Sequence, residues 1–144
     1  DGRLDVGGAR TVVVNVAGSA IALDGRVVSR PRDDLVAYRL PRQPHVRWLA
    51  DGLAADGWTG RTLQYRAWPL RGGHYELTLS LPRGETDRIV TIDGGRKIVV
   101  TAKRPRHLAV ATNGAPLRLD VDAPHAPFYG RFFGVQVSRL RFRP

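Results

Sequence analysis

Apolar and polar residues alternate with a period of two in several stretches of this chain. In the clearest stretch, YELTLSL at residues 75–81, tyrosine and leucine occupy the odd positions, and Glu, Thr and Ser the even ones. In LRLDV at residues 117–121, leucine and valine alternate with charged residues. Successive side chains of a strand point to opposite faces of a sheet, so both segments are predicted to be strands with one buried face.

The last apolar segment, GVQVSRLRF at residues 134–142, changes phase in its middle. Its valines precede Ser138-Arg139 at odd positions, whereas Leu140 and Phe142 follow at even positions. One extra residue in a strand restores a common face for apolar side chains of opposite parity. The pattern therefore predicts a β-bulge near Ser138-Arg139.

Short turns separate the apolar segments, in keeping with 16 glycines and 10 prolines. Asp24-Gly25 and Asp93-Gly94-Gly95 have the residue types that tight hairpin turns favour, because both sequences readily adopt positive φ angles. The predicted hairpins pair residues 20–23 with 26–29, and residues 88–92 with 97–101. Only residues 47–55 also allow a turn or two of helix, ended by Asp56-Gly57.

Taken together, the segments predict an all-β fold with about nine to eleven short strands. We expect a two-sheet antiparallel sandwich of the jelly-roll kind. At 144 residues the chain has the size of a single domain. The strands of residues 1–44 are expected to join the same core as residues 45–144, with Pro41 to Pro44 as an internal boundary. No apolar run approaches the about 18 residues of a membrane span, so any such segment is expected outside this chain.

The chain is strongly basic, with 23 Lys and Arg against 13 Asp and Glu and a formal net charge of +10. This excess favours anionic partners such as nucleic acid, acidic lipid headgroups or charged polysaccharide, and a merely solvated basic surface is the alternative. The arginines are spread along the whole chain, and no RNP, KH or helix-turn-helix signature accompanies them. The pattern therefore disfavours nucleic acid and leaves an anionic membrane surface as a candidate partner.

Catalytic motifs are absent from the sequence. The chain has no cysteine, no GxSxG element and no phosphate-binding loop with its lysine, and its four histidines lack metal-ligand spacing. We therefore predict a non-catalytic chain without a cofactor. Asp120 and Asp122 share one face of a predicted strand and are candidate ligands of a structural calcium ion. The alternative is that these two carboxylates pair with neighbouring arginines.

The side chains fit sugar binding better than catalysis. A sugar ring stacks its C–H face on an aromatic side chain, and its hydroxyl groups bond to carboxylates and to the forked donors of arginine. Trp58 lies in a glycine-flanked loop close to Asp56 and Arg61. The alternative is structural: Trp58 closes one end of the sandwich, and Asp56 caps the turn.

Two segments of the chain resemble a known family. GLAADGWTGR at residues 52–61 and FFGVQVSRLRF at residues 132–142 resemble the "GL-x-x-DGW-x-G" and "LGV-x-(V/L)-x-R-(L/I)" elements. These elements belong to the extracytoplasmic C-terminal region of actinobacterial membrane glycosyltransferases of the arabinosyl- and mannosyltransferase kind. In that family a loop before the second element carries polar residues and an arginine, which Arg131 matches here, and Tyr129 lies in the same loop. Phe132-Phe133 depart from the family pattern.

The resemblance implies a carbohydrate-binding-module-like sandwich attached to a membrane-embedded enzyme. Its expected role is to bind or orient a cell-wall polysaccharide acceptor on the extracytoplasmic face, while catalysis belongs to the transmembrane part. The residues expected to contact the glycan are Asp56, Trp58, Arg61, Tyr129 and Arg131. Two other roles remain open: a scaffold that packs on the enzyme's own transmembrane domain, and a basic domain that binds polyanions.

Overall fold

A computed structural model describes residues 2–126 and 130–144, and in these residues the chain is all-β, with strands and no helix. This confirms the predicted fold class and the antiparallel sheets, whereas the jelly-roll path stays a prediction. The strands are β1 (Thr11–Asn15), β2 (Ser19–Leu23), β3 (Arg26–Arg32), β4 (Leu35–Arg39), β5 (Val46–Leu53), β6 (Thr59–Ala67), β7 (Gly72–Ser80), β8 (Arg88–Ile92), β9 (Arg96–Val100), β10 (Arg106–Asn113), β11 (Leu117–Val121), β12 (His125–Ala126), β13 (Arg131–Phe132) and β14 (Gln136–Arg143).

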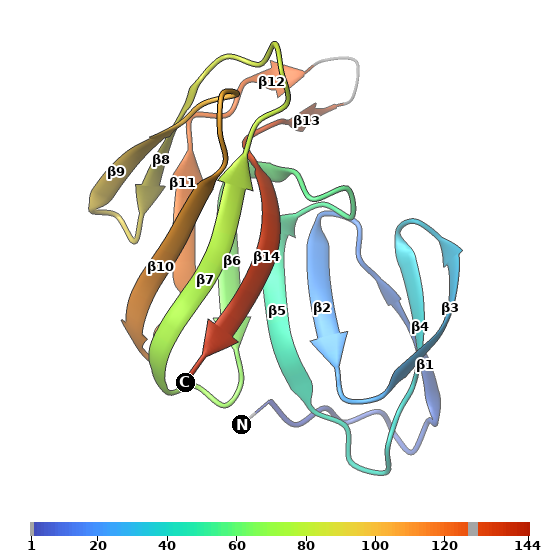
Figure 1. Ribbon diagram of the computed structural model, residues 1–144. Coiled ribbons are helices and arrows are strands. Elements are labelled where there is room, and N and C mark those ends of the chain that lie inside the picture. Colours follow the sequence, from blue (N-terminus) through green and yellow to red (C-terminus); the bar gives the residue numbers. More distant parts are fainter. Residues whose placement is uncertain (1, 127–129) are drawn as a thin grey trace.

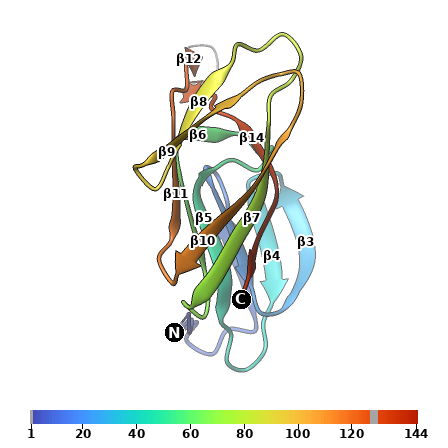
Figure 2. The same cartoon turned by 60° about the vertical axis from the view of Figure 1, so that its left-hand side comes forward.

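The strands form layers that face one another (Figures 1 and 2). A six-stranded sheet has the order β2-β5-β6-β11-β8-β9, and a three-stranded sheet has the order β10-β7-β14. A second three-stranded sheet, β1-β4-β3, lies beside β2, and β12 pairs with β13 in a short ribbon. The ribbon lies at the end of the molecule where β5 turns into β6, and the C-terminus lies at the other end (Figure 1).

The main hydrophobic cluster fills the space between the six-stranded sheet and β10-β7-β14. Leu63 of β6 and Leu119 of β11 are fully buried in it. Across the two layers, the rings of Tyr65 and Tyr75 meet edge to face, with centroids 5.5 Å apart. Tyr75, Leu77 and Leu79 of β7 are buried here, as the alternation of residues 75–81 predicts.

A smaller hydrophobic cluster lies under β1-β4-β3 and contains Val36 and Tyr38. The Tyr38 hydroxyl donates to the carbonyl oxygen of Ile21, 3.0 Å away, which ties this sheet to β2. Neighbouring residues of β2 contribute to different clusters: Ala20 packs on the main cluster and Ile21 on the smaller one. Strand β2 therefore joins the N-terminal sheet to the sandwich.

The two predicted hairpins have different outcomes. Strands β8 and β9 pair around Asp93-Gly94-Gly95, which confirms that turn. The hairpin at Asp24-Gly25 is wrong, because β2 pairs with β5 and β3 pairs with β4. At this point the chain passes from one sheet to another, and Arg47 Nε donates to Asp24 across 2.8 Å. The helical alternative for residues 47–55 is also wrong, because β5 is a central strand of the six-stranded sheet.

The β-bulge predicted near Ser138-Arg139 is confirmed. The pairing of β14 with β7 shifts register between Ser138 and Arg141, and Arg139 has a φ angle of 55°. Val135 is buried in the main cluster, and Leu140 packs against it from beyond the bulge. The bulge thus turns the apolar residues before and after it toward one core.

Arg139→Gly is expected to stabilise the fold by about 0.5–1 kcal/mol. A non-glycine residue at this φ angle costs about 1–2 kcal/mol, and the entropy of glycine in the unfolded chain offsets part of the relief. Urea unfolding of the variant measures the gain. The matched control is Arg96→Gly on β9, where φ is not positive, and it is expected to lower stability. Equal changes in the free energy of unfolding for the two variants would contradict the positive φ angle at Arg139.

Candidate functional site

The turn between β5 and β6 carries Trp58 at one end of the sandwich. The Ala54 N–H donates to the Trp58 carbonyl oxygen, and the Gly57 N–H donates to the Ala54 carbonyl oxygen, both across 2.9 Å. The Trp58 N–H donates to Oδ1 of Asp56 at 3.3 Å. Asp56 therefore caps this turn, as the structural alternative anticipated, and one of its oxygens remains for another partner.

The turn is supported by the segment that leads into β14. The Thr59 N–H donates to the Val135 carbonyl oxygen at 2.9 Å, and the Val137 N–H donates to the Gly57 carbonyl oxygen at 2.8 Å. Gly134 lies so close that a Cβ atom there would stand 2.2 Å from Oγ1 of Thr59. Residues 57–59 and 134–137, which belong to the two segments that carry the resemblance, are thus paired directly in space.

The indole of Trp58 is half-buried rather than enclosed. Part of the side chain packs on the main hydrophobic cluster. Its ring meets the ring of Phe133 edge to face, with centroids 5.2 Å apart and planes at 88°. The remaining surface of the indole lines two hollows at this end of the molecule.

Arg131 of β13 lies beside Trp58 and pairs with Asp56. The guanidinium bonds to Oδ2 of Asp56 and covers the Phe133 ring, 4.3 Å from its centroid. Partial burial raises the pKa of the Asp56 carboxyl, but bonds from Arg131 and from the Trp58 N–H, together with the Arg131 charge, outweigh it and lower the pKa below its ordinary value. Asp56 is therefore an ionised acceptor at neutral pH.

The other predicted residues stand differently. Arg61 is exposed on β6, and its guanidinium lies over the Phe132 ring, 4.2 Å from the centroid. Arg61 therefore contacts Phe132, the residue that follows Arg131 in the chain. Tyr129 lies outside the residues that the structure describes. The structure thus brings Asp56, Trp58 and Arg131 together, with Arg61 at their margin.

Three neighbouring hollows meet at Arg131, which lines all of them. Their volumes are about 570, 460 and 470 Å³. The first reaches Asp33-Asp34 at the turn between β3 and β4, and the second lies against Trp58 and several glycines. The third extends from Trp58 to Arg88. Trp58 lines the second and the third of these hollows.

Arg88 is a site residue that the sequence analysis missed. Its side chain is 3% exposed and pairs with Glu85 through Nη2 at 2.9 Å, while Nη1 donates to Thr86. Among the described residues no group accepts from its buried Nε. The signal in the sequence was parity, because Arg88 has the same parity as Val90 and Ile92, which are buried in the main cluster.

The two candidate calcium ligands have other partners. Arg118 donates to both carboxylate oxygens of Asp120, and the Thr62 hydroxyl donates to Oδ1. These bonds, above all the one from Arg118, hold the pKa of Asp120 below its usual range. Asp122 accepts from the Ile89 N–H at 2.7 Å. In the described part of the chain, no group of three or more His, Asp or Glu side chains is arranged to hold a metal ion.

Comparison with protein-family models, with curated proteins and with solved structures finds no match to this chain. In the part of the chain that the structure describes, no helix has the length and apolar character that crossing a membrane requires.

Proposed function

We propose that this chain is a non-catalytic module that binds a glycan at the end of the sandwich formed around Trp58. One observation carries the proposal: a half-buried indole lines two of the three hollows that meet at Arg131, beside two arginine–carboxylate pairs. A sugar ring stacks on the accessible part of such an indole through its C–H bonds. The polar groups beside it then bond to the ring's hydroxyl groups.

The charge balance of the site favours a neutral sugar over a polyanion. Asp56 pairs with Arg131 and Glu85 pairs with Arg88, so these four side chains carry no net charge. Each pair still offers both donors and acceptors, which is what a hydroxyl group needs. Because no surplus cation faces the hollow from these pairs, affinity for a neutral glycan is expected to change little with salt, in contrast to counterion-driven polyanion binding.

We further propose that the module belongs to a membrane glycosyltransferase of cell-wall polysaccharide assembly and orients its acceptor on the extracytoplasmic face. The support is the resemblance of residues 52–61 and 132–142, in which residues 57–59 pair directly with residues 134–137. In that setting the acceptor chain would lie along the three hollows. The catalytic groups would belong to the enzyme's transmembrane part.

A chemical-shift titration with arabinan, mannan and galactan oligosaccharides tests the glycan site. We expect one of them to shift the amide signals of residues 56–59 and 131–134. Trp58→Ala is expected to weaken that binding about tenfold or more. The reference is the stacking of a nucleobase on one aromatic side chain, whose loss costs about 1–3 kcal/mol. Trp58→Phe should retain part of the affinity, since it keeps an aromatic face.

The matched control is Trp68→Phe, since Trp68 is also half-buried but lines none of the three hollows. The Trp68→Phe variant should bind the glycan with the affinity of the parent chain. Absence of any shift with all three glycans would reject the site and leave the scaffold role. Trp58 would then serve only to pack on the main cluster. Binding that disappears steeply with added salt would instead indicate a polyanion.

A further inference from the structure

The end of the sandwich opposite Trp58 is made of four segments that are separated in the sequence. These segments, here called the basic end, are residues 2–10, 24–26, 39–47 and 66–72. Residues 45–47 hold them together, because each of the other three segments shares a backbone hydrogen bond of 2.7 or 2.8 Å with this stretch. The basic end lies where β6 turns into β7 (Figure 1). Strand β6 has nine residues, so roughly 25–30 Å separate the basic end from the turn that carries Trp58.

The basic end carries eight arginines and only two aspartates. All eight arginines are exposed; they are Arg3, Arg10, Arg26, Arg39, Arg42, Arg47, Arg66 and Arg71. Both aspartates have partners within the same end. Asp5 accepts from the Gly7 N–H at 2.9 Å, and Asp24 accepts from Nε of Arg47 at 2.8 Å. Eight positive and two negative charges leave a surplus of six here, out of a net charge of +10 for the whole chain.

Two of these arginines stand directly opposite each other. Arg26 of β3 and Arg39 of β4 are register partners in an antiparallel pair, so their side chains share one face of the sheet. Among the residues that the structure describes, no carboxylate forms an ion pair with either of them. Like charges in this position repel and destabilise a sheet. An anionic partner that binds both guanidinium groups removes that cost.

An exposed apolar turn accompanies the arginines. Leu70, between β6 and β7, is 49% exposed, and Pro69 beside it is exposed as well. Trp68 is half-buried, and the guanidinium of Arg66 lies over its ring, 5.7 Å from the centroid. Tryptophan and aliphatic side chains next to cations are typical of protein surfaces that enter the headgroup region of a bilayer.

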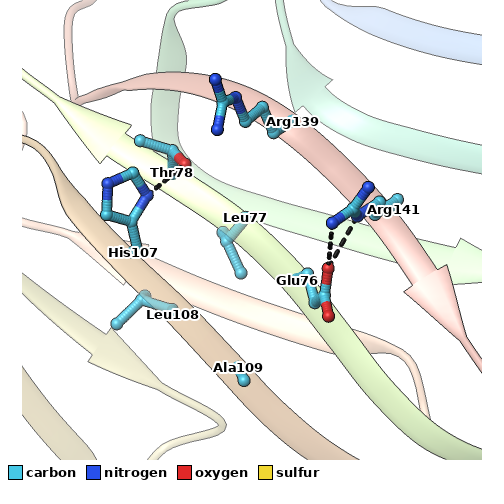
Figure 3. A pocket seen from close by; sticks show the side chains of 8 residues that line it. All are labelled: Glu76, Leu77, Thr78, His107, Leu108, Ala109, Arg139 and Arg141. Carbon is cyan, nitrogen blue, oxygen red and sulfur yellow. Dashed lines mark hydrogen bonds and ion pairs between the residues drawn. The ribbon is translucent and has the colours of Figure 1, made fainter.

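The face of β10-β7-β14 drawn in Figure 3 also carries arginines, but it lacks this combination. There Arg141 and Arg143 both bind the carboxylate of Glu76, at 2.6 and 3.0 Å. None of the large apolar side chains that are exposed in the described part of the chain belongs to β7, β10 or β14. Surplus charge and an exposed leucine therefore coincide at the basic end and not on this face.

We propose that the basic end docks on a lipid bilayer whose surface carries anionic headgroups. The arginines bind the phosphate groups of the lipids, and Leu70 enters the apolar layer beneath them. A nucleic acid or an anionic polysaccharide offers the charges but no apolar layer for the leucine. The distance between the basic end and Trp58 exceeds the screening length of about 10 Å in ordinary salt, so the two surfaces act independently. The proposal therefore does not depend on glycan binding.

Flotation of the full chain with lipid vesicles tests this proposal. We expect the chain to float with vesicles of equal parts phosphatidylcholine and phosphatidylglycerol, and not with phosphatidylcholine alone. Arg42→Glu combined with Arg71→Glu is expected to weaken binding about tenfold or more, since each basic residue near an anionic surface contributes about fivefold. Leu70→Ser is expected to weaken it about threefold or more, because the exposed half of the leucine no longer becomes buried.

The matched controls place the same changes away from the basic end. Arg83→Glu combined with Arg104→Glu alters the net charge equally, at two exposed positions in the turns before β8 and β10. Val99→Ser removes an apolar side chain of β9 that is 45% exposed. Both controls should bind the vesicles like the parent chain, and so should Trp58→Ala.

The proposal is overturned if the anionic vesicles do not bind the chain. It is also overturned if the two double variants lose the same affinity, because binding would then follow net charge alone. A third result against it is that Leu70→Ser binds like the parent chain while heparin displaces the vesicles. The basic end would then be a surface for polyanions and not for a bilayer.

Discussion

Gly52→Ala is expected to destabilise the chain by about 2–5 kcal/mol. Gly52 has a φ angle of 78°, which costs alanine about 1–2 kcal/mol. In addition, a Cβ atom would stand 1.9 Å from the carbonyl oxygen of Thr62 on β6, so the two central strands would have to separate. Overpacking of that kind typically costs about 1–3 kcal/mol more, because the Thr62 backbone cannot move aside as a flexible side chain would. Urea unfolding of the variant measures the total.

The matched control is Gly94→Ala in the turn between β8 and β9. Gly94 has a similar φ angle of 73°, but a Cβ atom there meets nothing within 4 Å. This variant isolates the conformational cost and is expected to lose only about 1–2 kcal/mol. If the two variants lose the same stability, the close approach of β5 to β6 at Gly52 is refuted.

Gly52→Ala also tests how the Trp58 turn is held. The register of β5 and β6 shifts between Asp51 and Leu53, and this irregularity precedes the turn directly. Strain at Gly52 is therefore expected to move the amide signals of residues 57–59 even under conditions where the variant is folded. Gly94→Ala should leave those signals in place.

Alkaline pH is expected to destabilise the chain through Tyr65. Burial raises the pKa of this hydroxyl from 10 to about 12, and the nearby Tyr75 adds to the shift. The folded state therefore holds this proton more tightly than the unfolded state does. The corresponding stability is fully present below pH 10 and is lost as pH rises through 12, by about 3 kcal/mol.

Tyr65→Phe separates this residue from other groups that titrate at high pH. The variant keeps the aromatic ring against Tyr75 but has no hydroxyl to ionise, so its stability should fall less between pH 10 and 12. Denaturant midpoints of both proteins across this range provide the measurement. Parallel losses in the two proteins would mean that Tyr65 does not control the alkaline transition. Tyr75 also has a raised pKa, chiefly through burial, and contributes a remaining part.

The local patterns predicted those features that depend on local geometry. Alternation in residues 75–81 identifies the inward face of β7, because a strand's side-chain period is two wherever it lies. The phase change around Ser138-Arg139 identifies the bulge for the same reason. Asp93-Gly94-Gly95 forms the expected turn, with positive φ at Asp93 and Gly94. Asp24-Gly25 has similar residues yet joins two sheets, because strand pairing is chosen by distant partners and not by the turn alone.

For the candidate site, residue chemistry was readable in advance, and its assembly was not. Trp58 and Asp56 are neighbours in the sequence, so their joint exposure follows from one turn. Arg131 bonds to Asp56 from 75 positions away in the sequence, and Arg88 lines the same hollow as Trp58. No short stretch of sequence contains both members of either pair.

Periodicity and turn-forming residues were enough to establish an all-β chain, its buried faces and the interruption in its last strand. The three-dimensional arrangement was needed to show which strands pair, that two hydrophobic clusters flank β2, and that three hollows meet at Arg131. The physical reason is the separation in sequence over which each effect acts. Side-chain direction along a strand depends on adjacent peptide units, whereas sheet order depends on the burial of surfaces contributed by residues far apart in the chain.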